Sequence, residues 1–380
     1  MEGPFQYCKV ETGRNFVGRK KELGILSNLL AADENVCLYD GPKTGKTSLL
    51  HQCFVSMRLS GRDFQAAELS FLGARDSESI LRRLASAVLR LGATTPQELA
   101  GAVRQYLPGS CWKFNADHYS VTGELLYAER EPGEDDARMV FTLPRRISAD
   151  SGRPVFTIIE EFQEILLADD GEKLLKIFEQ ALREAEIGNS CYIFTGSRIN
   201  AMKYIFEQKK YFFRNVERVE MQQLDPRELA ENINKGFLTG GKVVERERII
   251  AICRRLRCHP WYIRHFAAIC DNLSKGYITE TTLMDAMDAL ISIHEPAFIA
   301  VTRDLTTFQL RLLKALVCGH TRFSSALTIE TYGLNSSANV RRLKDALCRK
   351  EIISFDEKGD AWIIDPLFEY WIKDRYFGIK

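Results

Sequence analysis

Two kinds of hydrophobic spacing alternate along the first 224 residues. Short apolar runs predict buried strands at 35–39, 64–72, 154–159 and 190–197. Apolar positions three and four residues apart predict helices at 17–31, 46–59, 78–92 and 172–187. Strands that alternate with helices predict an α/β fold, in which a parallel sheet carries helices on both faces.

The pattern changes from about Asp225 onward, where only helical spacing continues and the strands are expected to stop. Residues 225–302 therefore predict a small helical domain. Residues 303–380 predict three helices followed by two short strands around Asp356–Gly359, which is the order of a winged helix-turn-helix. Residues 1–224 would form the sheet domain, with an irregular insertion of unassigned role at 105–150.

Composition narrows the class of protein without naming a function. The 380 residues are 45% hydrophobic and 27% charged, with a net charge of +1, which excludes a wholly basic nucleic-acid coat. Ten scattered cysteines form no C-x-x-C pair, so a zinc site or redox dithiol has little support and reduced thiols are expected. The N-terminus resembles no signal peptide and no apolar run reaches 18 residues. We expect a cytoplasmic protein with no membrane partner.

The stretch CLYDGPKTGKTSLL at 37–50 nearly satisfies the phosphate-binding pattern G-x-x-x-x-G-K-[ST]. Gly45, Lys46 and Thr47 are in place, but Asp40 stands at the first glycine position and Gly41 follows one residue late. A loop between a strand and a helix can bind phosphate oxygens with its backbone N–H groups. Lys46 would then reach the outer phosphates and Thr47 would ligate Mg²⁺. The alternative is an ordinary strand-to-helix turn with a chance G-K-T.

An acidic pair ends a later apolar run. Glu160 follows VFTII at the position where NTPases with this phosphate-binding pattern hold Mg²⁺. Glu161 is the next residue, where a water-activating base would lie. The usual residue at the first position is aspartate, so the longer Glu160 predicts slow hydrolysis. The alternative is a solvated strand edge.

Together with the loop, four further motifs resemble one family. FVGRKKEL before the loop, IIEEFQE, IFTGSR with MKYIF, and HPWY in the helical region are similar to the archaeal-type ATPases of the STAND/AAA+ class. These P-loop NTPases are related to archaeal origin-recognition initiators. The resemblance covers nearly the whole chain and implies a P-loop sheet domain, a helical lid and a C-terminal winged helix.

The resemblance also implies ATP as the ligand and assigns residues to it. The cradle would be formed by Gly41, Pro42, Lys43, Thr44, Gly45, Lys46, Thr47 and Ser48. The base and ribose would lie beside Val17, Gly18 and Arg19, and His259 and Pro260 would close over the adenine although Cys258 replaces the family's usual glycine. Ser197 and Arg198 match the sensor position.

Several of these assignments have a plain structural alternative. Arg198 can be a surface arginine after a buried strand rather than a phosphate sensor. Pro260 can be an ordinary helix-start proline. Arg214 can reach a neighbouring subunit's nucleotide, which would require a homo-oligomer, or it can lie on a basic solvated face with Lys209, Lys210 and Arg218.

The C-terminal segment leaves two interpretations open. Residues 336–353 predict a serine-capped helix that buries Val340, Leu343 and Leu347 and leaves five basic residues facing outward: Arg341, Arg342, Lys344, Arg349 and Lys350. Such a helix can contact duplex DNA or can act as an internal clamp. Residues 303–380 hold 13 Lys and Arg against 10 Asp and Glu, a weak positive excess. The sequence thus predicts an ATP-hydrolysing switch or, alternatively, a nucleotide-dependent DNA-binding or scaffold protein with negligible hydrolysis, with a protein partner left open.

Overall fold

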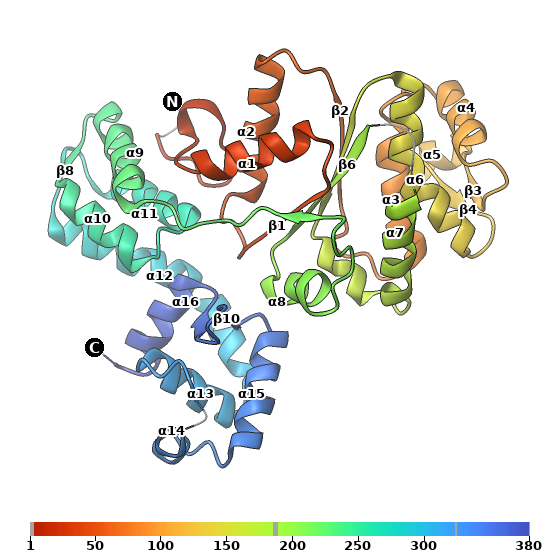
Figure 1. Ribbon diagram of the computed structural model, residues 1–380. Helices are drawn as coiled ribbons and strands as arrows, with labels where there is room; N and C mark the ends of the chain where they lie inside the picture. Colours follow the sequence, from red (N-terminus) through yellow and green to blue (C-terminus); the bar gives the residue numbers. More distant parts are fainter. Residues whose placement is uncertain (1–3, 185–188, 324, 380) are drawn as a thin grey trace. The chain divides into compact units, whose positions relative to one another are not determined.

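The computed structural model describes residues 4–184, 189–323 and 325–379. These residues form two compact units (Figure 1). One unit contains residues 20–40 and 50–221, and the other contains the residues up to 19, the segment 41–49 and the chain from 222 onward. None of the described helices is both long enough and apolar enough to cross a membrane.

The first unit is built on a five-stranded parallel sheet with the strand order β2–β5–β6–β1–β7. Its central strands are buried along their whole length because helices pack on the sheet, so their sequences are continuous apolar runs. The predicted α/β fold with a parallel sheet is therefore confirmed. The strands are β1 (Val36–Tyr39), β2 (Gln65–Ser70), β5 (Val155–Glu160), β6 (Ser190–Gly196) and β7 (Glu217–Arg218).

Helices on this unit follow the predicted alternation. The helix α6 packs against α3 and α7 and contacts β5 and β6, while α1 contacts β1. Stacked phenylalanines fill the space between α6, α7 and the sheet, with the rings of Phe141 and Phe178 only 4.0 Å apart. The helices are α1 (Lys20–Ala31), α2 (Lys46–Leu59), α3 (Ser77–Leu89), α4 (Pro96–Tyr106), α5 (Ala116–Thr122), α6 (Glu134–Ser151), α7 (Gly171–Glu184) and α8 (Ile199–Lys203). The end of the predicted helix 172–187 lies outside the described residues.

The segment expected to be irregular contains more order than its pattern indicated. It holds a two-stranded antiparallel pair, β3 (Trp112–Lys113) with β4 (Tyr127–Ala128), and the 18-residue helix α6. The helix α6 was not predicted because Pro144 lies inside it and because its first turn carries three acidic residues. Those carboxylates favour the positive end of the helix dipole, so the acidic patch marks a helix start.

The second unit is largely helical. Its helices are α9 (Pro226–Thr239), α10 (Arg246–Arg255), α11 (Pro260–Leu273), α12 (Glu280–Arg303), α13 (Thr307–Val317), α14 (Ala326–Thr331), α15 (Ser337–Arg349) and α16 (Pro366–Trp371). The expectation that strands stop at Asp225 is wrong in one detail, since two short parallel strands pair there: β8 (Val243–Val244) and β9 (Tyr277–Ile278). One continuous apolar core runs through this unit.

The C-terminal part of this unit follows the predicted order of three helices and a hairpin. The strands β10 (Ile353–Phe355) and β11 (Ala361–Ile363) pair antiparallel after α13, α14 and α15. Ser336 caps α15 by accepting a hydrogen bond from the Asn339 backbone N–H, and Val340, Leu343 and Leu347 are buried as expected. Lys344 differs from the expectation: it is half-buried, and its ammonium lies 4.4 Å from the Phe355 ring centre.

Candidate functional site

The loop at 41–48 has the backbone of an anion cradle. Lys43 and Gly45 both have positive φ values, of 59° and 97°, and α2 begins at Lys46 directly after them. This arrangement gathers backbone N–H groups at a helix N-terminus, which is the element that binds phosphate in many proteins. Gly41 lies outside the left-handed region, and an added Cβ there would meet only ordinary contacts at 3.6 Å or more. The glycine that the loop requires is therefore Gly45.

Lys46 is buried within this loop and is held by it. The Lys46 Nζ donates a 2.7 Å hydrogen bond to the carbonyl of Gly41, and the Thr44 hydroxyl donates to the same carbonyl at 3.0 Å. A buried ammonium is costly unless acceptors surround it. The loop thus keeps a cation at the start of α2, on the same short segment as the backbone N–H groups.

The segment Val17–Gly18–Arg19 contacts the loop from the N-terminal side. The Arg19 guanidinium is 8% exposed and donates to the backbone carbonyls of Thr44, at 2.8 Å, and Gln222, at 2.9 Å. Gly18 packs against Leu224. Arg19 therefore connects the loop to the chain that enters α9.

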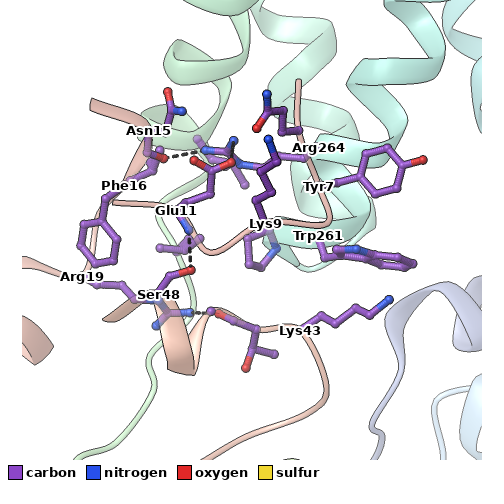
Figure 2. Close-up of a pocket in the computed structure, with 17 residues that line it drawn as sticks. Tyr7, Lys9, Glu11, Asn15, Phe16, Arg19, Lys43, Ser48, Trp261 and Arg264 are labelled. Atoms are coloured by element: carbon purple, nitrogen blue, oxygen red, sulfur yellow. Dashed lines mark hydrogen bonds and ion pairs between the residues drawn. The ribbon is translucent and has the colours of Figure 1, made fainter. Parts of the chain in front are cut away.

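A cavity of about 90 Å³ lies beside the loop. Figure 2 shows side chains from separate stretches of sequence around it. The N-terminal segment, the loop and the start of α11 contribute Gln6, Tyr7, Lys9, Glu11, Asn15, Phe16, Val17, Arg19, Lys43, Thr44, Gly45, Ser48, Pro260, Trp261 and Arg264, and Leu224 and Leu229 complete the lining. The cavity thus combines aromatic and aliphatic walls with a few charged groups, the usual composition of a small-molecule site.

A buried ion pair joins two of these stretches. The Arg264 guanidinium donates to the Glu11 carboxylate at 2.9 Å and to the Asn15 carbonyl at 2.6 Å (Figure 2). The two side chains are only 11% and 15% exposed. Burial lowers the pKa of Arg264, and the Glu11 carboxylate opposes that shift. The Glu11 backbone N–H also donates to the Ser48 hydroxyl at 3.1 Å, which ties the N-terminal segment to α2.

The start of α11 contacts the loop at two points. The Lys43 ammonium lies 3.5 Å from the Trp261 ring centre, a cation–π contact. The His259 Nε2 lies 3.0 Å from the Pro42 carbonyl, while its Nδ1 accepts from the Tyr262 backbone N–H as the cap of α11. A ring that accepts at Nδ1 and donates at Nε2 is the neutral imidazole with the proton on Nε2. Pro260 is the first residue of α11, the helix-start role, and it also lines the cavity.

The acidic pair stands at the carboxyl end of the sheet. Glu160 is the last residue of β5, and Glu161 follows it with a left-handed backbone. The Glu161 Oε2 accepts hydrogen bonds from Ser197, which follows β6, and from Gln163, each at 2.6 Å. Arg198 pairs with the Glu164 carboxylate at 3.7 Å. The structure therefore brings Glu161 and the predicted sensor residue Ser197 into direct contact.

The residues predicted to hold Mg²⁺ have suitable chemistry for it. Thr47 lies in the first turn of α2 and Glu160 ends β5 half-buried, so they offer one hydroxyl and one carboxylate oxygen. Within the described residues, no group of three or more His, Cys, Asp or Glu could hold a metal. Mg²⁺ is usually bound by one or two protein oxygens plus substrate phosphates, not by an all-protein cage. A hydroxyl and a carboxylate therefore fit this ion.

Sequence reasoning missed much of the cavity. The predicted residues that line it are Val17, Arg19, Lys43, Thr44, Gly45, Ser48 and Pro260, and those that lie outside the lining are Gly18, Gly41, Pro42, Lys46, Thr47 and His259. Tyr7, Glu11 and Arg264 were not predicted. The signal in the sequence was an arginine on an otherwise apolar helix face, next to the HPWY motif. Arg214 is exposed, and its guanidinium lies 5.3 Å from the centre of the Phe213 ring.

Comparison with known proteins bears on this arrangement. No family model and no curated protein matches the sequence. A Walker-type ATPase of Pyrococcus abyssi matches in structure over 97% of this chain and 99% of its own, with a TM-score of 0.68 and 16% identity. The chain has the fold of that ATPase. The ORC2 protein of Aeropyrum pernix, in its ADPNP–ADP complexes, matches over 92% of this chain and 90% of its own, with a TM-score of 0.57 and 13% identity.

Proposed function

We propose that this protein is an ATP-binding switch that hydrolyses ATP slowly. The observation that carries the proposal is the loop at 41–48, where the buried Lys46 and the backbone of Gly45 stand at the N-terminus of α2. A phosphate chain needs this combination of a fixed cation, a helix N-terminus and a close backbone approach. The two structural neighbours described above support the proposal, since one is a Walker-type ATPase and the other was solved with ADPNP and ADP.

The cavity beside the loop would take the base and ribose. Its volume of about 90 Å³ is well below the roughly 300–1,000 Å³ of sites that enclose a drug-sized ligand. It therefore suits part of a nucleotide, with the phosphates on the loop. Val17, Arg19, Pro260 and Trp261 would contact that part, and His259 and Gly18 would support it from the outer side.

Hydrolysis would use residues of the loop and of the sheet edge. Lys46 would neutralise the outer phosphates, Arg198 would sense the terminal phosphate, and Glu161 would accept the proton of the attacking water. Thr47 and Glu160 would hold Mg²⁺, which supplies charge neutralisation on the phosphates when it is bound. Glu160 is one methylene longer than the usual aspartate, which is the reason to expect slow turnover.

The alternative function is a nucleotide-dependent DNA-binding or scaffold protein with negligible hydrolysis. Residues 303–380 would then be a DNA-binding winged helix, and the exposed Arg341, Arg342 and Arg349 on α15 favour that possibility. In the proposed switch, the same segment is a clamp on a helical lid at 225–302. The hydrogen bonds from Arg257 to the Ile363 carbonyl and from Tyr262 to the Asp365 carboxylate support the clamp.

Two variants test the proposal. Lys46→Ala should abolish ATP binding in calorimetry while the protein keeps its melting temperature, because Lys46 is not part of the apolar core. Glu161→Gln should bind ATP as the wild type does and should lose about 100-fold or more in turnover, the usual contribution of a general base. Unchanged affinity in Lys46→Ala would refute the phosphate loop. Wild-type binding without measurable turnover would favour the alternative.

A further inference from the structure

Two side chains hold the same oxygen of the Glu161 carboxylate. The Gln163 Nε2 and the Ser197 Oγ each donate to Oε2 at 2.6 Å, and they arrive from different elements, the 3₁₀ turn η2 (Phe162–Leu167) and the end of β6. Glu161 itself has a φ of 50°, an uncommon conformation for a residue other than glycine, asparagine or aspartate. Its left-handed backbone turns the chain into η2 and so brings Gln163 back onto the carboxylate of the residue two positions earlier.

The Gln163 side chain is buried beside the end of β6. It is 1% exposed, and its amide oxygen is a buried acceptor without a hydrogen-bond partner among the described residues. The amide cannot simply turn over, because a carboxylate only accepts hydrogen bonds and would repel the amide oxygen. A Cβ added to Gly196 would lie 2.5 Å from that oxygen, so the glycine leaves room for Gln163 at the end of β6. A buried polar side chain with an unsatisfied acceptor calls for a role beyond packing.

The two hydrogen bonds involve only one of the two Glu161 carboxylate oxygens. Both donors bind Oε2, and within the described part of the chain Oε1 of Glu161 accepts no hydrogen bond. A general base must present a free oxygen in a fixed place to take a proton from water. We infer that Gln163 and Ser197 are positioning residues, which fix Oε2 so that Oε1 is available to the attacking water. This inference rests on the proposed hydrolysis and goes beyond it by naming the residues that orient the base.

The experiment compares kcat, KM and ATP affinity in the full chain. Gln163→Met keeps the length of the side chain and removes the donor, and Ser197→Ala removes the other donor. Each should lower kcat about 10-fold or more, because each deletes a hydrogen bond to a charged group, while KM and ATP affinity stay within about twofold. Ser197→Thr retains the hydroxyl and should keep most of the activity. Gln97→Leu, on the exposed side of α4, is the matched surface control.

The decisive measurement repeats Gln163→Met in a Glu161→Gln background. A residue that acts through Glu161 has nothing to position there, so the second change should cost no further turnover. An equal loss in both backgrounds, or a wild-type kcat in Gln163→Met, would overturn the inference and leave the proposed hydrolysis intact. If the wild type itself binds ATP and turns none over, hydrolysis fails and the inference fails with it. A rise in kcat in Gln163→Met would mean that the two donors restrain Glu161, which contradicts the inference.

Discussion

Arg264 and Glu11 form a buried ion pair at 2.9 Å although 253 positions separate them in the sequence. The pair joins the N-terminal segment to α11, and both residues line the cavity beside the loop at 41–48. An arginine on an otherwise apolar helix face is retained at a desolvation cost, so its partner has to be present for the fold to tolerate it.

Breaking this pair should destabilise the protein strongly. Arg264→Met leaves the Glu11 carboxylate buried without its partner, and the free energy of unfolding in urea should fall by about 3 kcal/mol. The double variant Glu11→Gln with Arg264→Met should recover much of that loss. Arg248→Met is the matched control, because its pair with Glu280 is exposed and should contribute less than about 1 kcal/mol. Equal losses at Arg264 and Arg248 would contradict this prediction.

The part of the site that could be predicted is the part encoded by neighbouring residues. Gly45, Lys46 and Thr47 lie within one turn of chain between a strand and a helix, so their spacing alone predicts a loop of this kind. Glu161 was predicted for the same reason, as the residue after an apolar strand. Glu11 with Arg264 could not be predicted, since only the folded chain brings them together. Gln163 was hidden because its contact with Glu161 depends on the left-handed turn at Glu161.

The fold shows the same division between local and non-local information. Four of the five sheet strands, β1, β2, β5 and β6, lie in the apolar runs where strands were predicted, whereas the charged strand β7 was not predicted. The helix α6 was obscured by Pro144 and by an acidic first turn. Lys344 was expected to face outward because charged residues on a helix usually do. Its position depends on Phe355, which comes close only through the turn after α15.

The two glycines of the loop at 41–48 should differ in their tolerance of substitution. Gly45 has a φ of 97°, so Gly45→Ala forces an unfavourable backbone conformation that costs about 1–3 kcal/mol and should weaken ATP binding. Gly41→Ala should bind ATP nearly as well as the wild type, since Gly41 has neither a positive φ nor a close neighbour. Calorimetric titration of both variants checks the difference. A larger loss at Gly41 would mean that the late glycine has a role that the loop geometry does not account for.

Acid should destabilise the region around His265. Burial, followed by His294 and Lys43, lowers the pKa of His265 to about 4 from the usual 6.5, and the ring stacks on Tyr7 with centres 4.2 Å apart. The unfolded chain therefore binds a proton between pH 6.5 and 4 that the folded chain does not, so the contribution of this residue is present above pH 6.5 and is lost as the pH falls towards 4. We expect the titration of His265 to lower the free energy of unfolding by about 1–2 kcal/mol as the pH falls from 7 to 4.5.

His265→Phe isolates this contribution from that of other groups titrating in the same range. Phenylalanine preserves the stacking on Tyr7 and removes the titration, so its urea unfolding should show a smaller loss between pH 7 and 4.5 than the wild type. The neighbouring His294, whose Nε2 lies 3.4 Å from the His265 Nδ1, also has a pKa lowered mainly by burial. His294→Phe should therefore reduce the remaining pH dependence further. An unchanged pH dependence in both variants would refute the assignment.

The basic face of α15 separates the two proposed functions. A DNA-binding helix would present Arg341 and Arg342 to phosphates, and affinity would fall steeply with salt as counterions are released. Lys344, however, lies over Phe355 of the hairpin. The hairpin is joined to the turn before α11 through the Arg257 hydrogen bond to Ile363, and His259, the cap of α11, contacts Pro42 in the loop at 41–48. These contacts favour a clamp that responds to nucleotide.

We therefore expect the triple variant Arg341→Ala, Arg342→Ala and Lys344→Ala to change ATP turnover and to leave DNA behaviour unaltered. Anisotropy titrations with duplex DNA at two salt concentrations, with and without ATP, measure the second property. Arg349→Ala with Lys350→Ala is the matched control, because it removes charge from the same helix and leaves the Lys344–Phe355 contact in place. Nanomolar, salt-sensitive binding by the wild type, with a salt slope that drops by about one for each lost phosphate contact in the triple variant, would establish DNA binding instead.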